Sequence, residues 1–211
     1  AGSMNPVEIL CYIGSRGVGA LEFEPPAGAA GKTSKIEIDE MVKLVNEVLS
    51  GRGDFSANIS NDRKRAIADI LRIGTSAGGA RAKAVIAFNE KTGEVRSGQA
   101  SSPKGFRHWL LKFDGVSDRQ MGVTQGYGRV EMAYHLMSGD CGIEMTECRL
   151  LEKNGRAHFM TRRFDRSNEG EKIHMQSLCA IRHFDFNEVN SFAYEQFFET
   201  ARMLSLPYPA Y

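Results

Sequence analysis

The chain has 211 residues and a mass of 23.3 kDa, with 42% hydrophobic and 25% charged residues and a formal net charge of +1. This is the composition of a soluble protein with one sizeable core or two small ones, and its charge gives no argument for binding nucleic acid or an acidic membrane. No apolar run reaches the roughly 18 residues of a membrane-spanning helix. The four cysteines lack C-x-x-C spacing, which favours reduced thiols in a cytoplasmic protein.

The first third of the chain predicts a strand or irregular hairpin and then two helices. Residues 1–4, "AGSM", resemble a tag remnant, and residues 8–26 form a β-prone stretch with glycine turns that ends at Pro25 and Pro26. A loop over 27–34 leads to a helix whose start is indicated by Ser34 and Glu37 at capping-box spacing and whose end is indicated by Gly51. One face of that helix is apolar: Ile38, Met41, Val42, Val45, Val48 and Leu49. Residues 62–74 predict a second, shorter helix.

The rest of the chain predicts a mainly antiparallel sheet followed by helices. Strands are expected over 82–88, weakly over 94–100, and over 107–114, where Trp109, Leu111 and Phe113 share one face. A helix over 128–142 is expected to bury an apolar side made of Val130, Ala133, Leu136 and Met137. Residues 144–166 predict a hairpin with Asn154-Gly155 as its turn. Two further helices are expected over 172–184 and 190–206.

The stretch "GTSAGGARAK" at 74–83 is the first candidate for chemistry. Gly78 and Gly79 lack side chains that would keep phosphate oxygens from backbone N–H groups, and Ser76 could add a hydroxyl donor. The G-x-x-x-x-G-K-[ST] pattern fails because Ala80 follows Gly79, and G-x-G-x-x-G fails because a helix precedes and a strand follows. From these residues alone, a phosphate loop and a plain helix end with a turn both stay open.

The order of the features that follow favours the phosphate loop. A second strand carries Lys112 among apolar residues, the next helix carries Glu131, and a hairpin ends in a cluster of charges. Protein kinases use this order: a glycine-rich flap, a strand lysine on the phosphates, a helix glutamate that holds the lysine, and a hinge. Two simpler alternatives remain, with Lys112 an edge-strand lysine that points to water and Glu131 a solvated helix residue.

At this point the chain resembles a known family. The segments "GTSAGGARAKAVIAF", "WLLKF", "RVEMAYHLMSGDCGI", "TRRFDR" and "KIHMQSLCA" are similar to HipA-type toxin kinases of the HipA/HipB toxin–antitoxin systems, over about residues 8–211. The resemblance implies an α+β fold: a protein-kinase-like N-terminal lobe with flanking helices, then the first helices of a C-terminal lobe. The implied divisions are the end of a small N-terminal subdomain over 5–35, a helical segment over 36–74, the kinase-like lobe over 75–168 and the helical lobe over 169–211.

The resemblance also implies roles for particular residues. Ser76 matches a serine that the family autophosphorylates, which ejects the loop and switches the enzyme off, and Glu131 matches the acidic residue that supports Lys112. The implied nucleotide contacts are Gly78, Gly79, Ala80, Arg81, Ala82, Lys83, Lys112, Arg162, Arg163, Phe164 and Asp165. The residues from Arg162 to Phe164 would form a hinge whose backbone reads the adenine edge. The first hinge position can be glutamate in the family, so a side-chain contact by Arg162 is in doubt, and an exposed strand position for Arg162 and Arg163 is the alternative.

Phosphoryl transfer also needs a catalytic aspartate, a nearby asparagine and an aspartate on Mg²⁺. The chain contains no D-x-x-x-K-N, and no aspartate follows Asp185. His183, Asp185 and Asn190 have the spacing of a kinase catalytic loop, but they lie too soon after the hinge. We expect Asp185 to be a turn residue or the N-cap of a helix that starts near Ser191. No catalytic or metal-binding residue is therefore expected here, and the chain reads as a truncated fragment.

The intact protein implied by the resemblance is a cytoplasmic Ser/Thr kinase toxin that uses ATP and Mg²⁺. Its expected substrate is a translation component such as an aminoacyl-tRNA synthetase. Its expected partner is a small DNA-binding antitoxin, so that DNA is contacted only indirectly, and no membrane is involved. One alternative is a non-catalytic module that binds the antitoxin or a missing catalytic lobe, and another is an ATP-binding domain with a different reaction.

Overall fold

The computed structural model describes residues 5–27, 35, 37–50, 82–99, 103–118, 122–123, 126–185, 188 and 191–207. The chain divides into two compact units, Ala1–Ile173 and His174–Tyr211. The predicted cap at Ser34, the helix over 62–74 and the glycine-rich loop up to Arg81 lie outside the described residues. Among the described residues, no helix has both the length and the apolar character needed to cross a membrane.

The first unit is built on a five-stranded antiparallel sheet, in the order β2-β1-β3-β7-β6. Its strands are β1 (Lys83–Phe88), β2 (Val95–Ser97), β3 (Arg107–Lys112), β6 (Cys148–Lys153) and β7 (Arg156–Arg162). A two-stranded sheet of β4 (Ser117–Asp118) and β5 (Gly122–Val123) follows β3 in the chain. The strands predicted over 82–88, 94–100, 107–114 and 144–166 and the α+β class are therefore confirmed.

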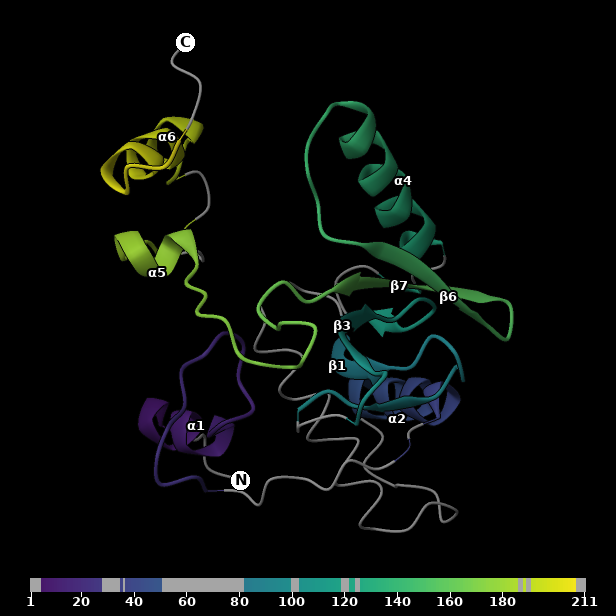
Figure 1. The fold of residues 1–211 in the computed structure, drawn as a ribbon. Helices are drawn as coiled ribbons and strands as arrows, with labels where there is room; N and C mark the ends of the chain where they lie inside the picture. Colours follow the sequence, from purple (N-terminus) through teal and green to yellow (C-terminus); the bar gives the residue numbers. More distant parts are fainter. Residues whose placement is uncertain are drawn as a thin grey trace. The chain divides into compact units, whose positions relative to one another are not determined.

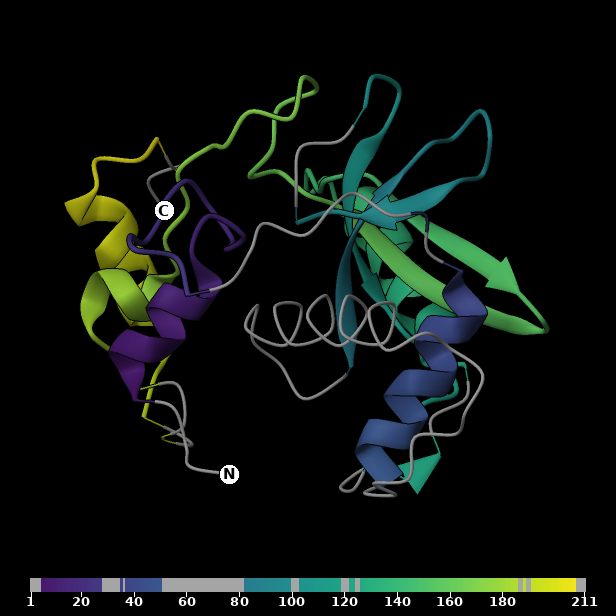
Figure 2. The same ribbon diagram turned by 90° about the horizontal axis from the view of Figure 1, so that it is seen from below.

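The predicted hairpin turn is also confirmed. Asn154 and Gly155 have φ values of 49° and 73°, as a two-residue turn between strongly twisted antiparallel strands requires. Figure 2 shows that the turns of the β1–β2 and β6–β7 hairpins point in different directions, which agrees with the twist of a sheet of this width.

One face of the sheet is covered by α2 (Ile38–Ser50), below the sheet in Figure 1. Buried residues of α2 include Ile38, Met41, Val42 and Val45, at the spacing that the sequence predicts. They share a core with side chains from the near face of the strands and the segment after β3: Ala84, Ile86, Val95, Trp109, Leu111, Phe113, Val116 and Met160. The helix and this face of the sheet thus form the hydrophobic core of the unit.

The opposite face is covered by α4 (Tyr127–Asp140), which packs on β6 and β7 (Figure 1). Gly128 permits the contact, because a Cβ at this position would lie 1.9 Å from the carbonyl oxygen of Ala157. The prediction that Val130, Leu136 and Met137 are buried is wrong: each is at least half exposed. The close approach at Gly128 turns a different helix face, at 128, 131, 132 and 135, toward the sheet.

The N-terminal segment differs from its prediction as well. Residues 6–13 form the helix α1 (Pro6–Ile13), where the sequence predicted a strand or hairpin. Asn5 accepts a hydrogen bond from the Glu8 N–H, the Glu8 carboxylate accepts one from the Asn5 N–H, and Pro6 occupies the first helical position. Asn5 and Pro6 precede the stretch from which the strand was predicted, and together with Glu8 they outweigh the β propensity of the apolar run that follows.

The second unit contains α5 (Leu178–Arg182) and α6 (Tyr194–Met203). The helix predicted over 172–184 is wrong before 178, because Ser177 caps α5 by accepting from the Ala180 N–H and Lys172 instead pairs with Arg166 in a β-bridge. Asp185 does not cap α6, which begins at Tyr194 after Ala193. Its carbonyl instead accepts a hydrogen bond from the Glu188 N–H at 3.1 Å, which agrees with the alternative of a turn residue. Within the unit, Phe184 stacks on Phe192 with ring centroids 4.7 Å apart.

Candidate functional site

Lys112 and Glu131 lie together on the sheet face beneath α4. The Lys112 Nζ is 2.5 Å from the Glu131 Oε2, and the two side chains are 30% and 22% exposed. Lys112 ends β3, which is the central strand of the sheet. The alternative of an edge-strand lysine that points to water is therefore wrong, and Glu131 is not a freely solvated helix residue.

Lys83 adds a second ammonium group at the same place. It is opposite Lys112 in the β1–β3 pairing and is only 4% exposed. Burial lowers the pKa of Lys83, the positive charge of Lys112 lowers it further, and the carboxylate of Glu131 partly opposes both effects. Two lysines around one carboxylate leave an excess of positive charge where the predicted glycine-rich loop meets β1 through Ala82, which suits an anionic ligand.

The same sheet face continues from Lys112 toward the end of β7 with mostly uncharged side chains. Leu110 is opposite Thr161 in β7, and Thr161 is opposite Cys148 in β6. The Cys148 thiol donates to the Thr161 hydroxyl oxygen at 3.4 Å, and burial raises the pKa of this thiol. Cys148 is therefore a packed thiol of low reactivity rather than a nucleophile.

The predicted hinge residues do not have a common environment. Arg162 is paired with Trp109, so its side chain lies on the α2 face, opposite Lys112 and Glu131. Its N–H donates to the Glu147 carbonyl at 2.8 Å, and the Arg163 N–H donates to the His108 carbonyl at 3.0 Å. Phe164 is 66% exposed. A hinge contact by Arg162 or Arg163 would thus need backbone atoms other than these two N–H groups.

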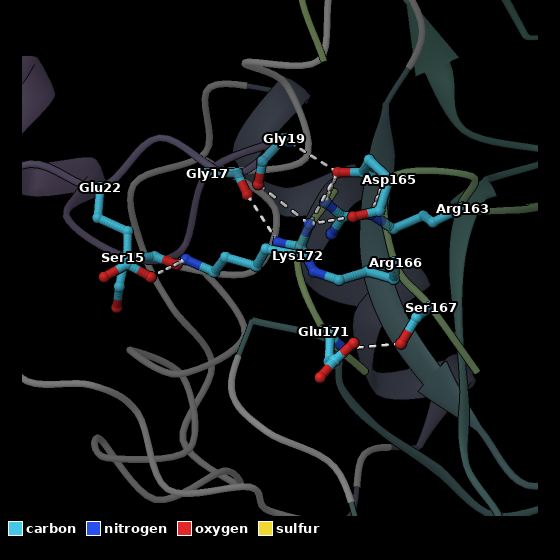
Figure 3. Close-up of polar contacts among 10 residues, drawn as sticks. All are labelled: Ser15, Gly17, Gly19, Glu22, Arg163, Asp165, Arg166, Ser167, Glu171 and Lys172. Carbon is cyan, nitrogen blue, oxygen red and sulfur yellow. Dashed lines mark hydrogen bonds and ion pairs between the residues drawn. The ribbon is translucent and has the colours of Figure 1, made fainter. Parts of the chain in front are cut away.

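Arg163 and Asp165 belong to a buried ion cluster with Arg166, shown in Figure 3. The Arg163 Nε lies 2.8 Å and its Nη2 2.5 Å from the Asp165 carboxylate, and the Arg166 Nη1 lies 3.0 Å from it. Burial alone would raise the pKa of Asp165, but hydrogen bonds from Arg163 and the Gly19 N–H, with the charges of both arginines, hold this pKa below its usual value. The alternative of Arg163 as an exposed strand residue is wrong.

Several residues around this cluster escaped the sequence analysis. Gly17, Gly19, Arg166 and Lys172 carry its contacts, yet none was predicted as a site residue. Two arginines that flank one aspartate in R-F-D-R are the one signal for an ion cluster. No spacing rule joins them to glycines about 150 residues earlier.

Two hollows of about 390 and 370 Å³ are lined by residues other than the predicted site residues. The first lies between Ile38, Phe88 and Leu151, and the second between Asp114, Gly126 and Arg156. Within the described part of the chain, no group of three or more histidine, cysteine, aspartate or glutamate side chains could hold a metal ion.

Together these features define an α+β domain with a lysine–glutamate pair on one face of an antiparallel sheet. The chain belongs to the family of the HipA-like C-terminal domain, whose model matches residues 75–210, more than half of the sequence. The resemblance to HipA-type proteins is thereby confirmed. No curated protein and no solved structure matches the chain.

Proposed function

We propose that this chain is the nucleotide-binding part of a HipA-type Ser/Thr kinase, the toxin of a toxin–antitoxin pair. The observation that carries the proposal is the ion pair between Lys112 on β3 and Glu131 on α4, with Lys83 beside it. In the proposed intact protein, the substrate is a translation component such as an aminoacyl-tRNA synthetase. A small antitoxin is the partner, it provides the only link to DNA, and the protein acts in the cytoplasm.

The charges of the site support ATP as the ligand. Glu131 holds the ammonium of Lys112 in one orientation, so that it can meet phosphate oxygens with little further loss of side-chain entropy. Lys83 adds positive charge at the end of the loop whose residues Gly78–Arg81 we propose to cradle the phosphates. Ser76, at the start of that loop, is the proposed site of autophosphorylation.

The polarity of the sheet face supports a placement for the rest of the nucleotide. The face runs from Lys112 through Leu110 to Thr161 and offers a mostly uncharged surface beside the charged end. A distance of two residues along β3 is about 6.6 Å, comparable to the reach from phosphate to base. We place the adenine near the end of β7, beside the backbone of residues 162–164.

The described residues do not form a binding site for Mg²⁺. When bound, Mg²⁺ would neutralise charge on the transferred phosphoryl group, but the described residues offer no carboxylate cluster for it. The sequence also has no D-x-x-x-K-N and no aspartate after Asp185. We therefore expect this chain alone to bind ATP only weakly and to transfer no phosphoryl group.

A titration of the ¹⁵N-labelled chain with ATP up to about 10 mM tests the proposal, because chemical shifts report weak binding. We expect shifts at the amides of Leu110 to Phe113, and a loss of at least about tenfold in affinity in Lys112→Ala. Lys104→Ala, which removes an exposed lysine in the turn before β3, is the control. Glu131→Gln keeps a hydrogen-bonding group at that site and guards against a misfolded Lys112 variant.

Two results would count against the proposal. The first is the absence of any ATP-dependent shift near Lys112. The second is equal ATP affinity in the Lys112→Ala, Glu131→Gln and Lys104→Ala variants.

A second candidate function is favoured by the outer face of α4. Tyr127, Val130, Tyr134 and Met137 form a stripe at helical spacing whose members are 38–65% exposed. We propose as the alternative that this chain is a non-catalytic module that binds an antitoxin or a catalytic lobe. The two functions differ in a melting experiment: a module gains stability from its protein partner without ATP, and Tyr134→Glu would abolish that gain.

A further inference from the structure

A short N-terminal segment, residues 15–22, lies along the chain that leaves β7, and we name it the strap. Its backbone is bound by side chains about 150 residues later in the sequence, as Figure 3 shows. The Gly19 N–H donates to the Asp165 carboxylate at 2.7 Å, and Arg166 donates to the carbonyls of Gly17 and Gly19, each at 3.1 Å. At its ends, Lys172 donates to the Ser15 carbonyl at 2.6 Å and pairs with Glu22.

The buried charges of the ion cluster depend on the strap for hydrogen-bond partners. Arg163, Asp165 and Arg166 are 7%, 3% and 9% exposed, so that two buried guanidinium groups share one buried carboxylate. Buried N–H groups need acceptors, and the carbonyls of Gly17 and Gly19 supply two of those that Arg166 uses. If the strap leaves, Arg166 loses these acceptors and Asp165 loses the Gly19 N–H.

The backbone conformation of the strap favours glycine at 19. Gly19 has a φ of +77°, a left-handed conformation that other L residues adopt at a cost. This conformation lets one residue offer both its N–H and its carbonyl to the same cluster. The strap is therefore seated by its backbone geometry as well as by charge.

The other side of the cluster is the end of β7. Arg163 connects this backbone to the cluster. Its side chain binds the Asp165 carboxylate, and its N–H donates to the His108 carbonyl of β3. We propose that Asp165 and Arg166 are positioning residues: through the strap they hold the backbone after β7 in the shape that receives a nucleotide base. This inference rests on the proposed function, and it gives Asp165 a role without ligand contact, in place of the predicted nucleotide contact.

If the strap holds the backbone that receives the nucleotide, binding of the strap and binding of the nucleotide are energetically coupled. A closed strap favours the binding shape of residues 162–164, so bound ATP must in turn favour the closed strap by the same factor. Coupling of this kind between sites changes affinity by about 5–150-fold. A purely structural role of the cluster predicts no response of the strap to ATP.

Hydrogen exchange and the ATP titration together test the coupling on the 211-residue chain. In the wild type we expect ATP to slow exchange of the strap amides. In Arg166→Gln we expect exchange in the strap to accelerate and ATP affinity to fall, each on the order of tenfold. Arg129→Gln is the control, since it removes an exposed arginine whose partner is Glu152.

A second pair of variants keeps the test independent of the buried charges. Gly19→Ala and Gly93→Ala both place a side chain at positive φ, at +77° and +70°, and Gly93 lies in the remote β1–β2 turn with open space around it. Both variants pay a similar backbone strain, so a difference in ATP affinity between them reports the strap. We expect the affinity to fall in Gly19→Ala and to stay within about twofold in Gly93→Ala.

The outcomes separate this inference from the proposed function. If the strap opens in Arg166→Gln and Gly19→Ala while ATP affinity stays at the wild-type value, the positioning role is wrong and ATP binding stands. If exchange in the strap does not change in either variant, the ion cluster does not hold the strap in place. If the wild-type chain shows no ATP-dependent shift, the proposed function fails and the positioning role with it, whereas hydrogen exchange still measures how firmly the ion cluster holds the strap.

Discussion

At the scale of single residues, the contact between Gly128 and Ala157 decides how α4 lies on the sheet. An added Cβ would sit 1.9 Å from a carbonyl oxygen that is fixed in a β-ladder, so the helix must move away. We expect Gly128→Ala to lower the free energy of unfolding by about 2–4 kcal/mol. Denaturant unfolding followed by circular dichroism measures this change.

Gly139 in the same helix provides the matched control. Its added Cβ would meet nothing within 4 Å outside the helix itself. Gly139→Ala should therefore stabilise the chain by about 0.5–1 kcal/mol through helix propensity alone. Equal effects of the two substitutions would show that the packing of Gly128 does not set the stability.

The ion pair of Lys112 and Glu131 allows a second prediction for single residues. Glu131→Gln leaves two lysines facing each other across β1 and β3 without a neutralising carboxylate. We expect a loss of about 1 kcal/mol, which for a chain of this size shifts the Tm by roughly 2–4 °C. The loss should become smaller in 1 M salt, because salt screens the repulsion; a loss that is independent of salt would contradict the electrostatic explanation.

At the scale of elements, α2 supplies one wall of the core. Met41 is fully buried between this helix and the sheet, while Lys43 on the same helix is exposed. Met41→Ala should cost about 2–5 kcal/mol, and Lys43→Ala should change the stability by no more than about 0.5 kcal/mol. Urea midpoints of the two variants test this, and a small effect at Met41 would mean that α2 packs only loosely on the sheet.

The elements that the sequence predicted well are those that local rules determine. A short apolar run predicted β1, and alternation predicted β3. Asn154-Gly155 predicted the β6–β7 turn, and apolar spacing predicted α2. The buried face of α4 was mispredicted because one glycine contact, rather than hydrophobicity, turns that helix. The segment after Asn5 was mispredicted because its helix start signals lie before the apolar run.

The residues of the candidate site likewise divide into those that the sequence order predicted and those that only the fold brings together. The order of motifs along the chain led to Lys112 and Glu131, and the structure joins them. The assignment of Asp165 as a ligand contact came from the family resemblance, and the resemblance could not show that Gly19 from the N-terminus already occupies its carboxylate. Contacts between such distant parts of a sequence depend on the whole fold.

At the scale of the whole molecule, two buried histidines link stability to pH. His108 is 7% exposed and His158 is 1% exposed. Burial lowers the pKa of His108, and the charges of Arg163 and Arg166 lower it further. Burial also lowers the pKa of His158, whose Nδ1 accepts a hydrogen bond from the Asp114 N–H and so favours the neutral ring.

The lowered pKa values of the two histidines make the folded chain less stable toward acid pH. Both histidines take up a proton less readily in the folded chain than in the unfolded chain, where histidine is protonated near pH 6.5. Below that pH the unfolded state binds more protons, so stability falls as the pH is lowered. The carboxyl group of Asp165, whose pKa is held low, adds a further loss only below about pH 4.

We therefore expect the Tm to fall between pH 7.5 and pH 5, before the carboxylates titrate. His108→Gln should flatten this dependence, because glutamine keeps a polar side chain but cannot be charged beside Arg163 and Arg166. His183→Gln is the control, since His183 is exposed. Equal slopes of Tm against pH in the two variants would place the acid sensitivity elsewhere. A flatter slope in His108→Gln alone would show that the buried His108, beside Arg163 and Arg166, contributes to the loss of stability in acid.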